Sequence, residues 1–395
     1  MTESALRRFA LFAYGFRPFF LAAGLSAVLV VPAWLAMIAQ GTMPLGALPP
    51  QLWHAHELFY GFVGAALAGF LLTAVPSWTG AKGFGGWPLA AVASAWLLGR
   101  LAFAAASFVP LWALAVAELA FFPGVAALLA PPLLRSRNRN TPLLFMLAAL
   151  WIADAVFLAG LARQDPLLAS RSLRIAIDLM LIVVTVIGGR IVPSFTANAL
   201  RRRGEAPEIR SLPWLERAVV ALMVAVALVD LWEPDGAVAG WLAALVAVAQ
   251  GVRLSGWRSL RTRGEAILWV LHLGYAWMPV GFALKALWLL AGAGWAAQWP
   301  HALTMGVFGT MILAVMTRAA LGHTGRELTV SGSVAAAYLL LTLGVAARVF
   351  APGLWPAQYL QTLFVSGALW TAAFALYLVV YTPILVLSRA DGKPG

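Results

Sequence analysis

About twelve apolar runs of roughly twenty residues follow one another along this 395-residue chain and leave little sequence for anything else. A helix that crosses the ~30 Å hydrocarbon core of a bilayer needs about 20 apolar residues. Backbone amides find no water partner in lipid, so these runs must be helical. The expected fold is all-α, a polytopic membrane bundle of about twelve transmembrane helices in a single integral membrane domain over 1–395. Its spans are predicted at 18–39, 55–76, 88–108, 110–131, 142–162, 173–194, 213–231, 236–254, 265–291, 299–319, 331–350 and 357–386.

The composition excludes a soluble enzyme. Charged residues make up only 11% of the chain, against about 25% in soluble proteins. The net charge of +12 would suggest nucleic-acid binding in a soluble domain, but the basic residues lie in short loops between apolar runs, where they report membrane topology. Because the chain has no cysteine, it has no disulfides, thiolate ligands, iron–sulfur clusters or covalently attached c-type haem.

The basic residues alternate between the two sides of the expected bundle. Most of them fall on one side: Arg7, Arg8, Arg17, Lys82, Arg135, Arg137, Arg139, Arg201, Arg202, Arg203, Arg210, Arg253, Arg258, Arg261, Arg263, Arg318, Arg326, Arg389 and Lys393. The loops of the other side carry only Arg163, Arg171, Arg174 and Arg348. Cytoplasmic loops are enriched in Lys and Arg, so both termini are predicted to be cytoplasmic.

Three of the five histidines lie near the outer ends of predicted spans. His54 and His56 open the second span beside Glu57, and His301 opens the tenth, so all share one expected depth. Residues two apart point to nearly opposite sides of a helix. His54 and His56 therefore chelate one metal only if the helix starts between them, and otherwise serve two partners.

The other two histidines are expected near the cytoplasmic face. His272 lies about 10 Å inside the ninth span, and His323 follows the tenth, so a hairpin would bring them to one site. The simpler alternative is a solvated His323 and a His272 hydrogen-bonded to a neighbouring carbonyl. A single membrane histidine is usually a packing residue, but five together favour metal ligation, because neutral imidazole is a common ligand.

Carboxylates add to the outer group of candidates. Glu118, Asp154 and Asp178 fall in the outer halves of their spans, at a depth similar to that of Lys285. Charged residues inside a membrane are costly and are often functional. Ion pairs that only stabilise the fold would explain the presence of these residues equally well. Methionines at helical spacing are mostly packing residues, with soft copper ligation as the minor alternative.

Several segments resemble the NnrS family. The most specific are Trp53-His-Ala-His-Glu57 and the block that begins His301-Ala-Leu-Thr-Met-Gly and ends at Arg326. The other similar segments are 14–20, 68–76, 78–80, 188–193 and 272–277. The resemblance implies a bacterial inner-membrane protein that contains haem b and copper and is linked to nitric oxide metabolism, denitrification and nitrosative stress.

Functional roles follow from this resemblance as expectations. His54, His56 and His301 would form an outer site and His272 with His323 an inner one, with haem outside and copper inside, or the reverse as the alternative. Arg190 or Arg318 would pair with haem propionates, and Glu57 or Asp178 would supply protons if nitric oxide were reduced at a histidine-ligated haem with electrons from a membrane donor. One alternative is a transporter or metal-delivery protein that supplies copper or iron to other enzymes, and another is a non-catalytic sensor.

Reporter fusions test the predicted topology. Fusions at the C-terminus and after Arg203 are both expected to report a cytoplasmic location, because both positions adjoin loops rich in arginine. A periplasmic signal from either fusion would contradict the topology.

Overall fold

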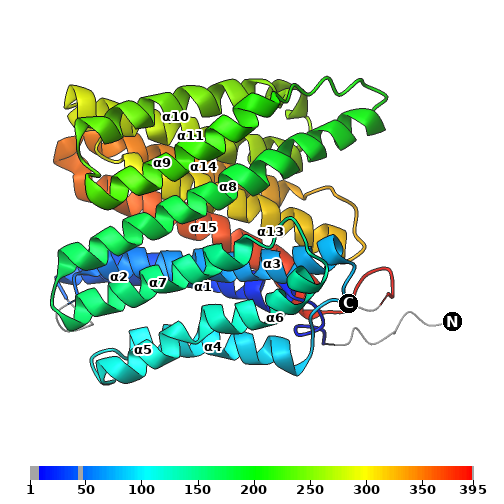
Figure 1. Ribbon diagram of the computed structural model, residues 1–395, viewed down its shortest axis with the longest axis horizontal. Helices are drawn as coiled ribbons and strands as arrows, with labels where there is room; N and C mark the ends of the chain where they lie inside the picture. The colour runs from blue at the N-terminus through cyan, green and yellow to red at the C-terminus, as the bar shows by residue number, and fades with distance from the viewer. Residues whose placement is uncertain (1–8, 43–47, 394–395) are drawn as a thin grey trace. The chain divides into compact units, whose positions relative to one another are not determined.

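The computed structural model describes residues 9–42 and 48–393, and its regular elements there are helices (Figure 1). Arg7 and Arg8 of the topology argument lie outside the described residues. The α-helices and π-helices are α1 (Phe16–Gln40), α2 (Pro50–His56), η1 (Glu57–Val63), α3 (Gly64–Thr79), α4 (Trp87–Ala104), α5 (Leu111–Leu119), α6 (Phe121–Arg135), α7 (Leu143–Ala162), α8 (Pro166–Arg202), α9 (Pro213–Trp232), α10 (Ala237–Ser255), α11 (Ala266–Ala291), α12 (Trp299–His301), η4 (Ala302–Gly309), α13 (Thr310–His323), α14 (Gly332–Leu354) and α15 (Tyr359–Val386). Short 3₁₀ turns lie at η2 (Ser259–Thr262), η3 (Gly294–Ala296) and η5 (Pro356–Gln358).

The all-α membrane fold predicted from the sequence is confirmed. Eleven helical segments within the described residues are long and apolar enough to cross a bilayer. The predicted span 213–231 is a helix of 20 residues, α9, but it is not apolar enough to be among these eleven. Its apolar character is reduced by three charged residues, Glu216, Arg217 and Asp230. The orientation of the termini stays a prediction.

The described residues divide into two compact units. The first comprises residues 1–176, 316–328 and 374–395, and the second comprises residues 177–315 and 329–373, with the undescribed positions left aside. The chain passes from the first unit into the second along α8, its longest helix (Figure 1).

In the first unit, one long apolar segment changes its helical type along its length. It starts at Pro50, whose ring suits the first turn of a helix, and switches to a π-helix at Glu57 before returning to α-helix at Gly64. π-helical turns are rare and frequently mark functional sites. Close packing holds this segment against α1, because a Cβ at Gly69 would lie only 2.8 Å from the ring of Phe20.

Arg17 ties the start of α1 to the end of α15 within the same unit. Its guanidinium is fully buried and donates hydrogen bonds to the carbonyls of Leu385 at 2.9 Å and Leu387 at 2.7 Å. Carbonyls at a helix C-terminus lack intrahelical partners and carry partial negative charge. The buried arginine therefore satisfies backbone acceptors that lipid could not.

The second unit neutralises the charges of α9 with two buried cations. Arg253 of α10 forms an ion pair with Glu216, to which its Nε donates at 3.2 Å, and a second hydrogen bond to Tyr275. Lys285 of α11 pairs with Asp230, and both side chains are buried. These pairs explain how a helix with three charged residues packs inside an apolar bundle.

Replacing Asp230 tests this account of α9. Asp230→Asn leaves the buried Lys285 ammonium without its counter-charge and is expected to destabilise the fold by about 3–5 kcal/mol. The measurement is thermal unfolding of the purified protein in detergent. Glu233→Gln, at the exposed end of α9, serves as the control and should unfold like the wild type. Equal unfolding temperatures for Asp230→Asn and the control would contradict the account.

Candidate functional site

His54 and His56 lie on one helix and have different partners. The helix begins at Pro50, before both of them, so the condition for joint chelation of one metal is not met. The ring of His54 stacks on Trp34 of α1, with centroids 4.1 Å apart. His56 points instead into a group of charged side chains. The spacing of the two histidines allows either joint chelation of one metal or two separate sets of partners, and the structure has separate partners for His54 and His56.

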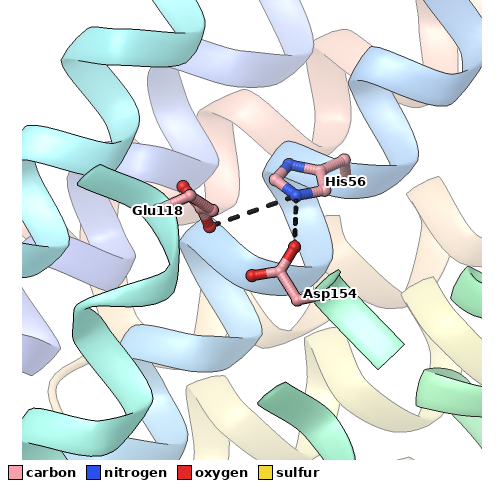
Figure 2. A group of neighbouring side chains, drawn as sticks. All are labelled: His56, Glu118 and Asp154. Carbon is pink, nitrogen blue, oxygen red and sulfur yellow. Dashed lines mark hydrogen bonds and ion pairs between the residues drawn. The ribbon is translucent and has the colours of Figure 1, made fainter. Parts of the chain in front are cut away.

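His56 is fully buried and uses both ring nitrogens. Its Nε2 lies 3.1 Å from Asp154 Oδ1 of α7, and its Nδ1 lies 3.1 Å from Glu57 Oε1 (Figure 2 shows the Asp154 contact). The rings of Phe103 and Phe157 lie against it, with centroids at 4.1 and 4.5 Å. These contacts fix the position of the imidazole inside an apolar surround.

Glu118 and Arg100 complete the group, which we call the His56 cluster: His56, Glu57, Arg100, Glu118 and Asp154. Glu118 Oε1 of α5 lies 4.0 Å from His56 Nε2 (Figure 2). Arg100 of α4 donates to Glu57 Oε1 at 2.6 Å and pairs with Glu118. The second carboxylate oxygen of Glu118 is buried and accepts no hydrogen bond from the described residues.

The His56 cluster contains more negative than positive charge. Three carboxylates and one guanidinium sum to −3 + 1 = −2 while the histidine is neutral. Buried net charge is costly in an apolar surround. The cluster therefore favours the uptake of positive charge, as a divalent cation or as protons.

Three members of the cluster are arranged as metal ligands. His56, Glu118 and Asp154 each offer one donor atom, and these atoms lie within 4.8 Å of one another (Figure 2). Donor atoms on one tetrahedral ion with bonds of about 2.0–2.2 Å lie roughly 3.4 Å apart, so a small adjustment would close the site. Glu57 on Nδ1 is the carboxylate partner that metal-bound histidines commonly have. One imidazole with two carboxylates suits a divalent first-row ion.

The remaining predicted site residues lie in other surroundings. Asp178 is buried on α8 within the second unit, while Arg190 is exposed further along the same helix. Arg318 is buried on α13 within the first unit. His301 is half-buried at the end of α12, in the second unit. Of the predicted proton carriers, Glu57 lies beside a predicted histidine ligand, His56.

His272 is held by hydroxyl groups in the second unit. Its Nε2 lies 2.8 Å from Thr196 Oγ1 and its Nδ1 lies 2.9 Å from Ser259 Oγ. A neutral imidazole can donate from one nitrogen and accept at the other, so these two hydrogen bonds satisfy the ring. The partners are hydroxyls rather than the carbonyl of the simpler alternative.

His323 lies in the first unit, at the end of α13. Its ring packs on Tyr14 and Phe16, with both centroid distances at 5.8 Å, and its carbonyl accepts a hydrogen bond from Arg389. Burial raises the pKa of the Tyr14 phenol, against an opposing effect of Arg389. Because His272 and His323 belong to different units, the proposed sharing of one cofactor stays a prediction.

Arg100 is the residue that sequence reasoning missed. It lies in the fourth turn of an otherwise apolar helix, α4, where an arginine is costly unless it is paired. That position is a usable signal. The identity of its partners cannot be read from the sequence, because Glu57 and Glu118 lie on two other helical segments, η1 and α5.

Removing Arg100 tests the electrostatics of the cluster. Arg100→Met leaves three buried carboxylates around one histidine and is expected to destabilise the fold by about 3–5 kcal/mol. Arg135→Met, at the exposed end of α6, is the matched control. Thermal unfolding in detergent provides the comparison. Adding Glu118→Gln to Arg100→Met should recover part of the loss, and identical unfolding of all variants would refute the ion-pair assignment.

Comparison with known proteins agrees with the resemblance seen in the sequence. No curated protein matches the chain. The family described as NnrS protein matches residues 10–389, which is nearly the whole chain. This range includes the His56 cluster and all five histidines. The protein is a multi-pass membrane protein and belongs to the NnrS family.

Proposed function

We propose that this protein is a bacterial inner-membrane metalloprotein of nitric oxide metabolism that carries haem b and copper. Membership of the NnrS family supports the cofactors and the link to nitric oxide. The observation that carries the proposal is the His56 cluster, a buried group with surplus negative charge and three donor atoms within 4.8 Å. A protein without a metal would have little reason to retain so costly a group inside its apolar core.

The His56 cluster fits copper in its divalent state and does not fit haem. A porphyrin needs an open ring nitrogen and an uncovered approach, whereas His56 engages both nitrogens and lies between two phenylalanine rings. His56, Glu118 and Asp154 would hold the ion, with Glu57 fixing the imidazole from Nδ1. Arg100 would orient Glu57 and Glu118 without binding the metal.

Haem would be held by histidines other than His56. His272, like His56, uses both ring nitrogens in hydrogen bonds, so neither nitrogen is open to the haem iron. The histidines that would hold the iron are therefore among His54, His301 and His323, and Arg190 or Arg318 would pair with the propionates. His54 is the first candidate, because Trp34 fixes its ring from one face.

The proposed chemistry consumes electrons and protons. Reduction of two nitric oxide molecules to nitrous oxide and water takes two electrons and two protons, and a membrane electron donor such as a quinol would supply the electrons. When bound, haem iron supplies the nitric oxide-binding position and a path for electrons. Glu57 and Asp178 are the proposed proton carriers, because both are buried carboxylates inside helical spans.

An absorption spectrum of the purified protein tests the proposal. The wild type should show haem bands that shift on addition of nitric oxide, together with bound copper. His54→Ala should lose the haem bands, whereas His272→Ala, the matched control, should keep them. His56→Ala should keep haem and lose divalent copper. A wild-type protein without haem, or a haem spectrum that does not respond to nitric oxide, would contradict the proposal.

A further inference from the structure

The chain contains an internal repeat that aligns residues 53–104 with residues 298–349 without a gap. The shift is 245 positions, as in 301 − 56 = 245. Twelve of the 52 aligned residues are identical, and six of these are leucines or alanines. The other six are His56 and His301, Gly61 and Gly306, Gly64 and Gly309, Thr79-Gly80 and Thr324-Gly325, and Gly99 and Gly344.

The local structure repeats in the same register. A π-helix follows the histidine in each copy, beginning at Glu57 in one and at Ala302 in the other. Gly80 and Gly325 both adopt a φ of 70°, a left-handed conformation that ends the helix and favours glycine. The next helices, α4 and α14, begin at Trp87 and Gly332, which are again 245 residues apart. Two rare π-helices at one shift are strong support for a repeat.

The neighbouring helices repeat as well, with shifts of their own. Trp34 of α1 stacks on His54 in the first unit, and Lys285 of α11 lies 5.0 Å from the ring centroid of Trp299 in the second. His54 and Trp299 correspond by the shift of 245. Trp34 and Lys285 therefore correspond too, with a shift of 285 − 34 = 251. Gly41 and Gly292, the left-handed glycines that end these two helices, have this same shift.

The segment that contains Glu118 has its counterpart in α15. A Cβ on Gly64 would contact the rings of Phe121 at 3.6 Å and Phe122 at 3.8 Å, and a Cβ on the corresponding Gly309 would contact the Trp370 ring at 2.6 Å. Helix α5 begins at Leu111 and α15 at Tyr359, a shift of 359 − 111 = 248, which pairs Phe122 with Trp370. The same shift places Ser366 where the first copy has Glu118. The repeat therefore comprises four helical segments in each copy.

The second copy replaces the charged residues of the cluster with neutral ones. His301 is retained, but Glu57, Arg100 and Glu118 become Ala302, Val345 and Ser366. Tyr60, whose ring lies 4.8 Å from that of His56, becomes Met305. Met305 Sδ lies 3.9 Å from Ser366 Oγ. Asp154 comes from α7, outside the repeat.

We propose that His301 and Met305 form a second metal position, which binds a soft monovalent ion such as Cu(I) or Ag(I). Residues four apart share a helix face, and the contact between His56 and Tyr60 shows that this π-helix brings them together. A thioether with an imidazole selects a soft ion, and Ala302 and Ser366, the counterparts of Glu57 and Glu118, offer no carboxylate to a divalent one. This assignment deepens the proposed function and rests on it, because it assumes that the first copy binds a metal. It leaves His54 and His323 as the histidines for haem.

Silver binding to the purified full-length protein tests this position, because Ag(I) is a redox-inert probe of soft sites. Isothermal titration should show one strong Ag(I) site in the wild type. Met305→Leu and His301→Ala are each expected to weaken it at least tenfold, since each removes one ligand. Met311→Leu, on the same helical segment but at a position equivalent to Ala66, is the matched control and should bind like the wild type.

The outcomes separate this inference from the proposed function. Unchanged Ag(I) affinity in Met305→Leu, or no Ag(I) binding in the wild type, would overturn the inference, and neither result affects the haem spectrum or its response to nitric oxide. Conversely, loss of Ag(I) binding in both variants of a protein without haem would support the second metal position and overturn the proposed function.

Discussion

The ion pairs of Arg100 with Glu57 and Glu118 are the interaction on which the first unit depends most. An arginine in the fourth turn of an apolar helix has no stable place unless carboxylates reach it. Those carboxylates in turn bring η1 and α5 against α4 and leave His56 among charged neighbours. The same constraint operates in the second unit, where Lys285 and Arg253 neutralise the acidic residues of α9. Charge pairing in an apolar surround thus accounts for both the packing and the candidate site.

The internal repeat gives the helical segments around His56 and His301 a common origin. Both copies retain a histidine followed by a π-helix, but Glu57 and Glu118 of the first copy correspond to Ala302 and Ser366 in the second. A duplicated scaffold can keep its backbone while its side chains diverge, because the glycines that set the helix contacts are separate from the residues that set the chemistry. The different donor atoms at His56 and His301 are the expected result of such divergence.

The sequence was sufficient to predict the fold class, because about twenty apolar residues leave a helix as the only stable backbone in lipid. The sequence was less informative where ion pairs determine how a charged helix packs in the bundle. The charges of α9 lower its apolar character, and only the structure shows that Arg253 and Lys285 compensate them. The second span was predicted to begin at residue 55, yet α2 begins at Pro50, because apolar length alone does not mark a helix start that proline favours. Each histidine and carboxylate of the cluster could be chosen from the sequence, but their grouping depends on contacts between distant helices.

The central claim is that the His56 cluster binds a divalent metal, and X-ray absorption at the copper edge tests it most directly. The purified wild type should contain copper with a shell of nitrogen and oxygen donors that includes one imidazole, as His56, Glu118 and Asp154 would provide. His56→Ala should lose this signal while the protein stays folded. Copper that is retained unchanged in His56→Ala, or a wild-type copper shell made only of sulfur and imidazole donors, would contradict the claim.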